Sequence, residues 1–275
     1  MKIKDLKGKK VGLAVSGGLD SCTITHWLTN NDVKVVCLVA DLGQQDEELE
    51  VVRKRLLDCG ALEVVIVEAK RQMAEAGLQV IQAQARYEGG YWNTTGIARH
   101  ITVAAILPKL IERGIGVFSH GATGRGNDQV RFQLATNMLA QGVEVYAPWR
   151  DPAFLSAFGG RKEMIEYCEK NNLPIKATPD KPYSTDANLL GLTHEAGRLE
   201  LLTTPADFVK PKMGVLPNNA PDEEEKVWVS FSEGVPVSIG VRNKESENRS
   251  ENREVRIEKS EVRSQKSEVR IEKTE

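Results

Sequence analysis

Short apolar runs rich in β-branched residues alternate with amphipathic segments over the first two thirds of the chain. The predicted strands are Val11–Val15, Val33–Val39, Glu63–Val67, Val117–Ser119 and Val143–Tyr146. The predicted helices are Asp20–Asn30, Glu47–Cys59, Arg71–Ala85, Ile97–Arg113, Asp128–Ala140 and Arg161–Asn171. Strands and helices that alternate in this way predict an α/β fold, with a doubly wound, mainly parallel sheet covered by helices on both faces.

The most turn-like segments of this region directly follow predicted strands. They are Ser16–Ser21, Asp41–Gln45 and His120–Asp128. The carboxyl ends of parallel strands lie at one edge of a sheet, so we expect the three segments to meet there. Open α/β sheets bind their ligands at that edge, which makes it the predicted functional site.

The pattern loosens after residue 171, where prolines become frequent. Val227–Phe231 and Val235–Val241 flank a Ser-Glu-Gly turn and predict a β-hairpin. We therefore predict a nucleotide-binding domain over residues 1–176 and a partial α+β domain over residues 177–242.

Residues 243–275 have a different composition, with nine basic, nine acidic and no aromatic side chains. A seven-residue repeat begins at Glu254, Glu261 and Glu268, each followed by Val-Arg. A coiled coil needs apolar residues at two heptad positions three or four apart, and this repeat lacks them. The segment is predicted to be a solvated, mostly disordered tail or a fraying helix.

The composition bounds the class of protein. A chain of 275 residues with 40% apolar side chains can bury a sizeable core, and a net charge of −2 argues against a nucleic-acid binder. The cysteines are scattered, which argues against a zinc or disulfide framework. They are Cys22, Cys37, Cys59 and Cys168. The apolar run near the N-terminus is too short for a signal peptide, and no segment approaches the ~20 apolar residues of a membrane span. We expect a soluble, cytoplasmic protein.

The segment Ser16–Ser21, Ser-Gly-Gly-Leu-Asp-Ser, suits a phosphate. It lies between a strand and a helix, where unpaired backbone N–H groups and the helix dipole favour an anion. Gly17 and Gly18 allow close approach, and the serines offer hydroxyl donors. No lysine follows, so this is not a P-loop. The segment resembles the S-G-G-x-D-S loop of the N-type ATP pyrophosphatases, and a chance Ser-Gly-Gly turn is the alternative.

Further motifs follow in order along the chain. They are Tyr87–Tyr91 with Asn93–Arg99, His120–Asp128 with Arg131, and Tyr183–Asn188 with Gly191–Glu195. Together with the Ser-Gly-Gly loop they resemble the argininosuccinate synthase family from about Lys10 to about Val241. In that family ATP activates the ureido oxygen of citrulline, and aspartate then displaces AMP from citrullyl-AMP, which serves arginine biosynthesis. The implied fold is adenine nucleotide alpha hydrolase-like.

The resemblance also implies site residues. For ATP with Mg²⁺, which would bridge phosphate oxygens, they are Ala14, Val15, Ser16, Gly17, Gly18, Leu19, Asp20, Ser21, Cys22, Ala40, Gly121 and Asp186. For aspartate they are Thr123, Asn127 and Asp128. For citrulline they are Tyr91, Asn127, Arg131, Ser184, Thr193 and Glu195. No catalytic residue and no protein metal ligand is assigned.

Structural roles are the alternatives for several of these residues. Tyr91 could pack between helices, and Arg131 could pair with Asp128 at the surface. Asn127 and Asp128 could serve only as a helix cap. Thr193 and Glu195 lie in a segment that no periodicity supports.

The chain also departs from the family pattern. Cys22 replaces a hydroxyl residue, Arg125 replaces a lysine, and Asn93–Gly96 differs from the usual Leu-Gly-Thr-Ser. The family continues beyond Val241 with more citrulline-binding residues and a C-terminal helix that joins the subunits of a homotetramer. The resemblance therefore predicts a truncated chain. The rival functions are another carbonyl-adenylating ATP pyrophosphatase and an ATP-binding remnant without turnover.

Overall fold

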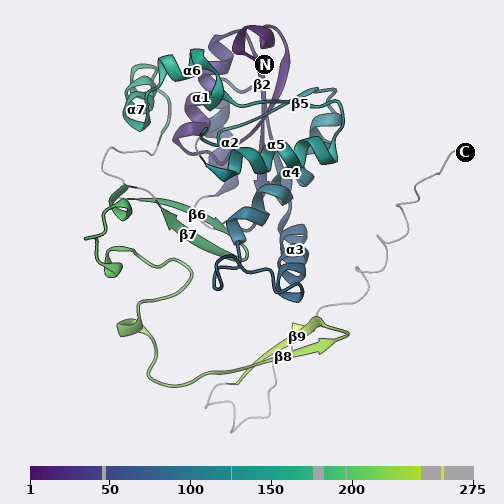
Figure 1. Ribbon diagram of the computed structural model, residues 1–275, viewed down its shortest axis with the longest axis vertical. Helices are drawn as coiled ribbons and strands as arrows, with labels where there is room; N and C mark the ends of the chain where they lie inside the picture. The colour runs from purple at the N-terminus through teal and green to yellow at the C-terminus, as the bar shows by residue number, and fades with distance from the viewer. Residues whose placement is uncertain (45–47, 125, 176–182, 196, 243–254, 257–275) are drawn as a thin grey trace, which may run out of the picture. The chain divides into compact units, whose positions relative to one another are not determined.

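The computed structural model describes residues 1–44, 48–124, 126–175, 183–195, 197–242 and 255–256. Internal contacts divide the chain into a first unit, Met1–Met213, and a second unit, Gly214–Glu275. A five-stranded sheet with helices on both faces forms the main body of the first unit (Figure 1). The domain boundary after residue 176 stays a prediction, since the contact division keeps residues 183–213 with the first unit.

The sheet of the first unit is parallel throughout, in the order β3-β2-β1-β4-β5. Its strands are β1 Lys10–Ala14, β2 Lys34–Asp41, β3 Glu63–Glu68, β4 Val117–His120 and β5 Glu144–Tyr146. The strand order reverses between β1 and β4, and Ala14 lies opposite His120 at the carboxyl ends of these two strands. A reversal of this kind opens the crevice in which doubly wound sheets bind ligands.

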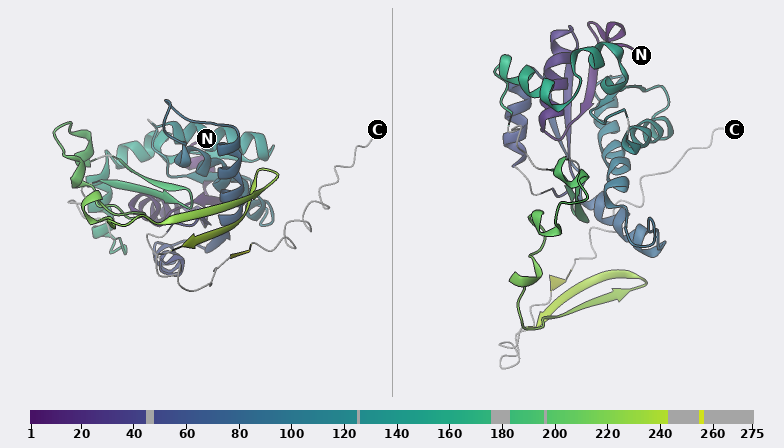
Figure 2. Two further views of the ribbon diagram at one scale, coloured as in Figure 1. Left: turned by 90° about the horizontal axis from the view of Figure 1, so that it is seen from below. Right: turned by 60° about the vertical axis from the view of Figure 1, so that its left-hand side comes forward.

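Helices cover both faces of this sheet (Figure 2). One layer comprises α1 Leu19–Asn30, α2 Leu49–Asp58, α6 Pro152–Ala157 and α7 Arg161–Lys170. The other comprises α3 Lys70–Gln82, α4 Thr94–Ile111 and α5 Asn127–Leu139. Neighbouring residues of β2 alternate between the layers: Val35 and Cys37 belong to one core cluster, Val36 and Leu38 to the other. Burial on both faces explains the nearly continuous apolar sequence of the strands.

The predicted α/β class with a doubly wound parallel sheet is confirmed. Helices α4 and α6 differ from the sequence prediction. Helix α4 begins at Thr94, before the predicted Ile97, and follows Asn93 in the left-handed region at φ 53°. Helix α6 was not predicted; the Asp151 carboxylate caps its N-terminus by accepting from the Ala153 N–H at 3.0 Å.

The first unit also contains an antiparallel hairpin that was not predicted. It is the hairpin of β6 Ser184–Asn188 and β7 Gly191–Glu195. The N–H of Leu189, in its turn, donates to the Leu42 carbonyl at 2.8 Å, which ties the hairpin to the segment after β2. Short 3-10 turns complete this unit: η1 Ile3–Leu6, η2 Pro148–Arg150, η3 Gly197–Glu200 and η4 Ala206–Phe208.

The second unit contains the predicted hairpin, here β8 Lys226–Ser232 and β9 Val235–Arg242, with η5 Pro217–Asn219 before it. The short strand β10, Val255–Arg256, pairs antiparallel with β9. Most of the predicted tail, residues 243–275, lies outside the described residues. Among the helices that the structure describes, none is long and apolar enough to cross a membrane.

Candidate functional site

The first loop, residues 15–18, connects β1 to α1 and is fixed by buried groups around it. The Ser21 hydroxyl accepts from the N–H groups of Ser16 and Gly17 at 3.1 and 3.2 Å. Arg55 of α2 donates to the Gly17 carbonyl at 2.9 Å. Ser21 was predicted to offer a hydroxyl donor to a phosphate, which stays a prediction; its oxygen serves here as the acceptor that these two loop N–H groups need.

Gly17 is required at its position. Its φ of +83° is in the left-handed region, and a Cβ there would lie 2.5 Å from Val52 Cγ1. Ser16 and Gly18 remain exposed beside it, at the N-terminus of α1. The other residues predicted around this loop belong to the strands or the core: Ala14, Val15, Leu19, Cys22 and Ala40.

The second loop, residues 121–126, connects β4 to α5. His120 is 1% exposed, stacks on Phe132 and accepts the Ala122 N–H on Nδ1 at 3.2 Å. Burial lowers the pKa of His120 to about 4, so its imidazole is neutral at pH 7. Gly121 follows directly, and a Cβ there would find only ordinary contact with Ile24, at 3.4 Å. The protein's own atoms therefore leave room for a side chain at Gly121, and its predicted role in ATP binding stays a prediction. Arg125 lies outside the described residues.

Asp20 extends the first loop into helix α1. Burial raises the pKa of its carboxyl, while a hydrogen bond from Trp149 and the charge of Arg161 oppose that rise. Trp149 Nε1 donates to Asp20 Oδ1 at 3.2 Å. The carboxylate is thus oriented by a neutral donor within the same rim of the sheet.

Two arginines and two carboxylates meet beside the second loop. Arg131 donates to Asp128 Oδ1 at 2.8 Å, and Arg99 Nε donates to Asp128 Oδ2, also at 2.8 Å. Arg99 also pairs with the Asp186 carboxylate of the β6–β7 hairpin. Burial alone would lower the pKa of Arg99, but the two carboxylates outweigh it and raise that pKa. Arg99 therefore joins α4, the start of α5 and the hairpin.

Arg99 lies in the Asn93–Arg99 motif, but the resemblance implies no ligand for it. The signal that was available is its place in the Asn93–Arg99 segment, but its partners lie 29 and 87 residues away. The alternative for Arg131, a pairing with Asp128, is what the structure shows. This pairing leaves a ligand role open, since other guanidinium nitrogens of Arg131 are not part of it.

Tyr91 is connected to the hairpin through Thr95. Its hydroxyl accepts from the Thr95 N–H at 3.1 Å, and the Thr95 hydroxyl lies 3.3 Å from that of Thr193. Burial raises the pKa of Tyr91, but the hydrogen bonds from Thr95 and Thr94 outweigh it and lower that pKa. Thr193 lies opposite Asp186 in the hairpin register, which places Tyr91 and Thr193 within the same cluster as Arg99.

Other predicted residues are less closely connected. Ser184 and Glu195 form the register pair at the open end of the β6–β7 hairpin, and both are exposed. Thr123 and Asn127 are exposed in and after the second loop. Asn127 precedes Arg131 by one turn of α5, but among the described residues no side-chain hydrogen bond joins Thr123 or Asn127 to Tyr91 or Arg131.

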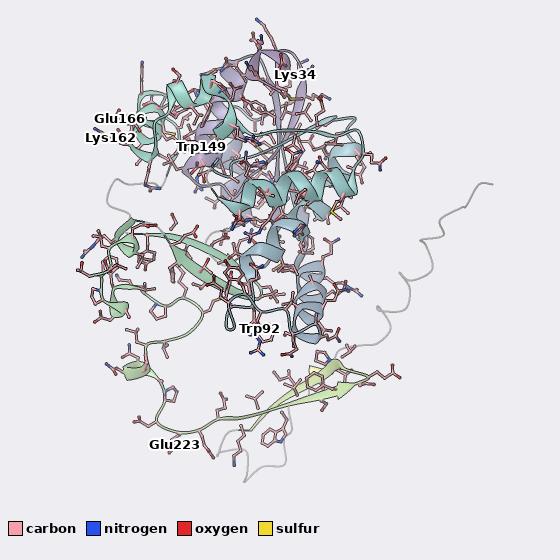
Figure 3. The ribbon with its side chains drawn as sticks, viewed as in Figure 1. Lys34, Trp92, Trp149, Lys162, Glu166 and Glu223 are labelled. Carbon is pink, nitrogen blue, oxygen red and sulfur yellow. The ribbon has the colours of Figure 1, made fainter. Side chains whose placement is uncertain are left out.

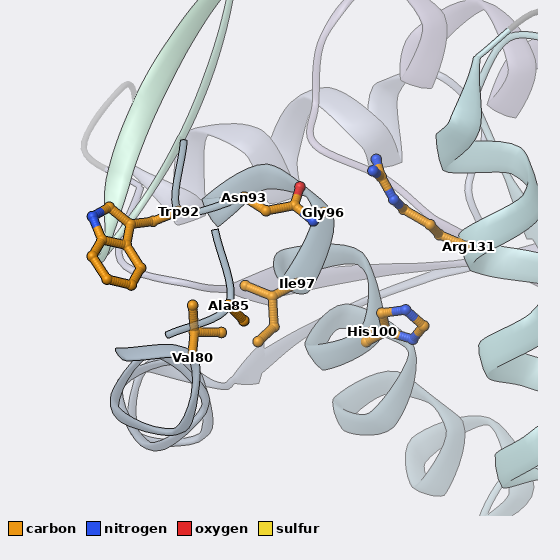
Figure 4. Close-up of a pocket in the computed structure, with 8 residues that line it drawn as sticks. All are labelled: Val80, Ala85, Trp92, Asn93, Gly96, Ile97, His100 and Arg131. Carbon is orange, nitrogen blue, oxygen red and sulfur yellow. The ribbon is translucent and has the colours of Figure 1, made fainter. Parts of the chain in front are cut away.

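A cavity of about 220 Å³ lies next to this cluster, and Figure 4 shows the side chains around it. Its lining is Val80, Ala85, Trp92, Asn93, Gly96, Ile97, His100 and Arg131. Among these lining residues, Arg131 is the one that the sequence resemblance predicts to bind citrulline. The Arg86 guanidinium lies 5.2 Å from the Trp92 ring centroid, which holds one wall of the cavity.

The strand order and the paired glycine loops at its reversal define the class: a nucleotide-binding α/β domain of the adenine nucleotide alpha hydrolase type. Two family models match the chain, the arginosuccinate synthase N-terminal HUP domain over residues 10–174 and the arginosuccinate synthase C-terminal domain over residues 183–269. The chain therefore belongs to the argininosuccinate synthase family. The second match includes most of residues 243–275, which the sequence resemblance did not reach.

Curated relatives agree with the family models. Argininosuccinate synthase of Rhodopirellula baltica is 41% identical over 84% of this chain and 58% of the relative. That of Thermotoga petrophila is 36% identical over 90% of this chain and 60% of the relative. That of Danio rerio is 39% identical over 83% of this chain and 55% of the relative. The chain thus spans about three fifths of the length of the curated relatives it matches.

Proposed function

We propose that this chain is an ATP-dependent ligase that condenses citrulline with aspartate, releasing AMP and pyrophosphate. The observation that carries the proposal is the meeting of the predicted substrate groups at one rim of the sheet. Ala14 and His120 place the starts of the two loops side by side, and Arg99 joins the start of α5 to the hairpin. An adenylating ligase needs its nucleotide and both amino acids within reach of one another.

The first loop is the proposed seat of the pyrophosphate end of ATP. Its exposed residues Ser16 and Gly18 lie at the N-terminus of α1, where the helix dipole favours an anion. Among the described residues, no group of three or more His, Cys, Asp or Glu side chains could hold a metal ion. As the resemblance implies, the proposed Mg²⁺ would be held mainly by phosphate oxygens, whose charge it neutralises.

The charged cluster is the proposed seat of the amino acids. Asp128 would hold the ammonium group of aspartate, and Arg131 the carboxylate of citrulline, as the resemblance implies. These two side chains pair with each other in the structure, at 2.8 Å. Because an amino acid carries both charges, bound substrates can replace this internal pair without leaving a buried charge uncompensated.

The chemistry proposed here is positioning with charge stabilisation. The ureido oxygen attacks the α-phosphorus and pyrophosphate leaves; the aspartate amine then attacks the ureido carbon and AMP leaves. No side chain of the cluster is assigned as a general base, so the rate enhancement would come from alignment and from donors aimed at the phosphates. The proposal includes arginine biosynthesis in the cytoplasm, and neither a nucleic-acid nor a membrane partner.

The test is AMP and pyrophosphate release from ATP by purified protein, with citrulline and aspartate present together, singly or absent. Release that requires both amino acids supports the proposal. Release that depends on another nucleophile would indicate a different carbonyl-adenylating enzyme. ATP binding without release under any condition would show a nucleotide-binding chain that does not turn over.

A further inference from the structure

Trp149, in turn η2 after β5, contacts the start of helix α1 beside the first glycine loop and also contacts the second loop. Its indole Nε1 donates to Asp20 Oδ1 at 3.2 Å, beside the first loop. Its backbone carbonyl oxygen lies 2.9 Å from the position that a Cβ at Gly124 would take, in the second loop. Figure 3 labels Trp149 among the side chains of the first unit. One residue therefore lies against two loops that are more than a hundred positions apart in the sequence.

The surroundings of Trp149 fix its position. Its ring packs edge-on against Phe154, with centroids 5.1 Å apart, and Phe154 is fully buried. Asp151, two residues on, accepts from the Tyr146 hydroxyl at 2.9 Å and caps α6 through Ala153. Because these contacts already fix the Trp149 indole, it loses little conformational freedom when its N–H donates to Asp20. The indole is therefore a preorganised donor.

The Asp20 carboxylate is partly buried, so a donor that favours its charged form stabilises it. Burial raises the pKa of its carboxyl, and the hydrogen bond from Trp149 favours the charged form. The contact with Gly124 is steric. The Trp149 carbonyl belongs to the backbone and cannot rotate away from the loop, so the position next to it must be a glycine without a Cβ.

We propose that Trp149 is a positioning residue that holds the two nucleotide loops in one arrangement, through the Asp20 carboxylate and the backbone at Gly124. This inference rests on the proposed function, in which both loops bind ATP. Trp149 does not itself touch the reacting atoms; it acts through Asp20 and Gly124. Neither the family matches nor the sequence resemblance assigned it a role.

Trp149→Phe tests the indole contact, because phenylalanine keeps an aromatic ring and removes the donor. Trp27→Phe is the matched control: the Trp27 ring also packs edge-on against Phe154, with centroids 5.0 Å apart. We expect Trp149→Phe to weaken ATP binding about tenfold, the loss of one hydrogen bond to a charged acceptor, and Trp27→Phe to change it less than about twofold. Citrulline affinity should stay unchanged in both variants. Equal losses of ATP affinity in the two variants would overturn the proposal.

A double-mutant cycle shows whether Trp149 acts through Asp20. In an Asp20→Ala background, Trp149→Phe should change ATP affinity by less than about twofold, because no side-chain acceptor for the indole N–H remains at position 20. A full additional tenfold loss would mean that the indole acts by another route. Gly124→Ala tests the backbone contact and should also weaken ATP binding, against Gly116→Ala, where a Cβ meets nothing within 4 Å.

Amide hydrogen exchange separates this inference from the proposed function. Trp149→Phe should speed exchange in peptides covering residues 14–22, and Gly124→Ala should speed it in peptides covering residues 120–124, while Trp27→Phe and Gly116→Ala leave both sets of peptides unchanged. This readout holds even if the wild-type protein binds no ATP, a result that would reject the proposed function alone. Unchanged exchange of residues 14–22 in Trp149→Phe, or of residues 120–124 in Gly124→Ala, would overturn the role of Trp149.

Discussion

The two glycine-rich loops begin side by side at the carboxyl ends of β1 and β4, yet they are held by different forces. The first loop is fixed by neutral or permanently charged groups of the core: the Ser21 hydroxyl, the Arg55 guanidinium and the Val52 side chain. The second loop lies between a titratable histidine, His120, and an aspartate that two arginines hold.

The difference indicates two kinds of binding element. The first loop is preformed, because its contacts come from the hydrophobic layer of α1 and α2 and do not depend on ligand. The second loop is anchored by Asp128 and Arg131, the groups proposed to bind substrate, so its anchors change when substrate binds. Preorganised donors suit a phosphate whose place is constant, and exchangeable ion pairs suit zwitterions that enter and leave.

Replacement of Gly17 by alanine is the most severe test of the preformed loop. The Cβ would meet Val52 at 2.5 Å, and φ of +83° strains any other residue. We expect the free energy of unfolding to fall by about 4 kcal/mol, by strain and overpacking together. Gly8→Ala is the control: its φ is +75° with nothing within 4 Å, so only about 1 kcal/mol of strain is expected. Urea unfolding measures both. Similar losses in the two variants would show that the packing on Val52 is unimportant.

Acid should weaken the second loop and spare the first. The pKa of His120 is lowered to about 4 by burial, against 6.5 for an ordinary histidine. Between these pH values the unfolded chain binds a proton that the folded chain does not, so stability is lost as pH falls from 6.5 towards 4. The loss should reach about 3 kcal/mol, and protonation of Nδ1 also removes the acceptor of the Ala122 N–H.

Urea unfolding at several pH values, combined with His120→Gln, checks this expectation. The variant should lose most of the pH slope between 6.5 and 4. His26→Gln is the control, because burial lowers the pKa of His26 as well but leaves its ring only half-buried. A slope that His120→Gln leaves intact would assign the acid sensitivity to other groups.

The sequence predicted the elements that are held by apolar packing and did not predict those that are held by polar contacts. The sheet, its flanking helices and the positions of both loops could be predicted from apolar periodicity. Strands that are buried on both faces need apolar residues at nearly every position, which makes them visible in the sequence. The β6–β7 hairpin does not follow, because its first strand reads Ser-Thr-Asp-Ala-Asn and is held by polar contacts to α4. The Ser21 hydroxyl accepts from the Ser16 and Gly17 N–H groups, and the sequence alone does not show which hydrogen-bond partners a serine will have.

Arg99→Met tests the ion pairs around the second loop. It leaves the Asp128 and Asp186 carboxylates without Arg99, and their side chains are each 27% exposed. We expect a loss of about 2 kcal/mol in unfolding free energy, below the range for fully buried pairs, and weaker aspartate binding. Arg113→Met, which breaks the exposed pair with Glu63, should cost less than about 1 kcal/mol. Equal losses would remove the distinction between the cluster and an ordinary surface pair.

Ser21→Ala is the mildest and most specific test of the comparison. The Ser21 hydroxyl accepts the N–H groups of Ser16 and Gly17, and a methyl group there leaves both without that acceptor. We expect a loss of about 1 kcal/mol, measured by urea unfolding, with little dependence on pH or salt because no charge is removed. Thr136→Val is the control, since its hydroxyl only adds a bond to the Phe132 carbonyl within α5. If Ser21→Ala cost nothing, the first loop would be held by packing on Val52 and by the Arg55 hydrogen bond, without a contribution from the Ser21 hydroxyl.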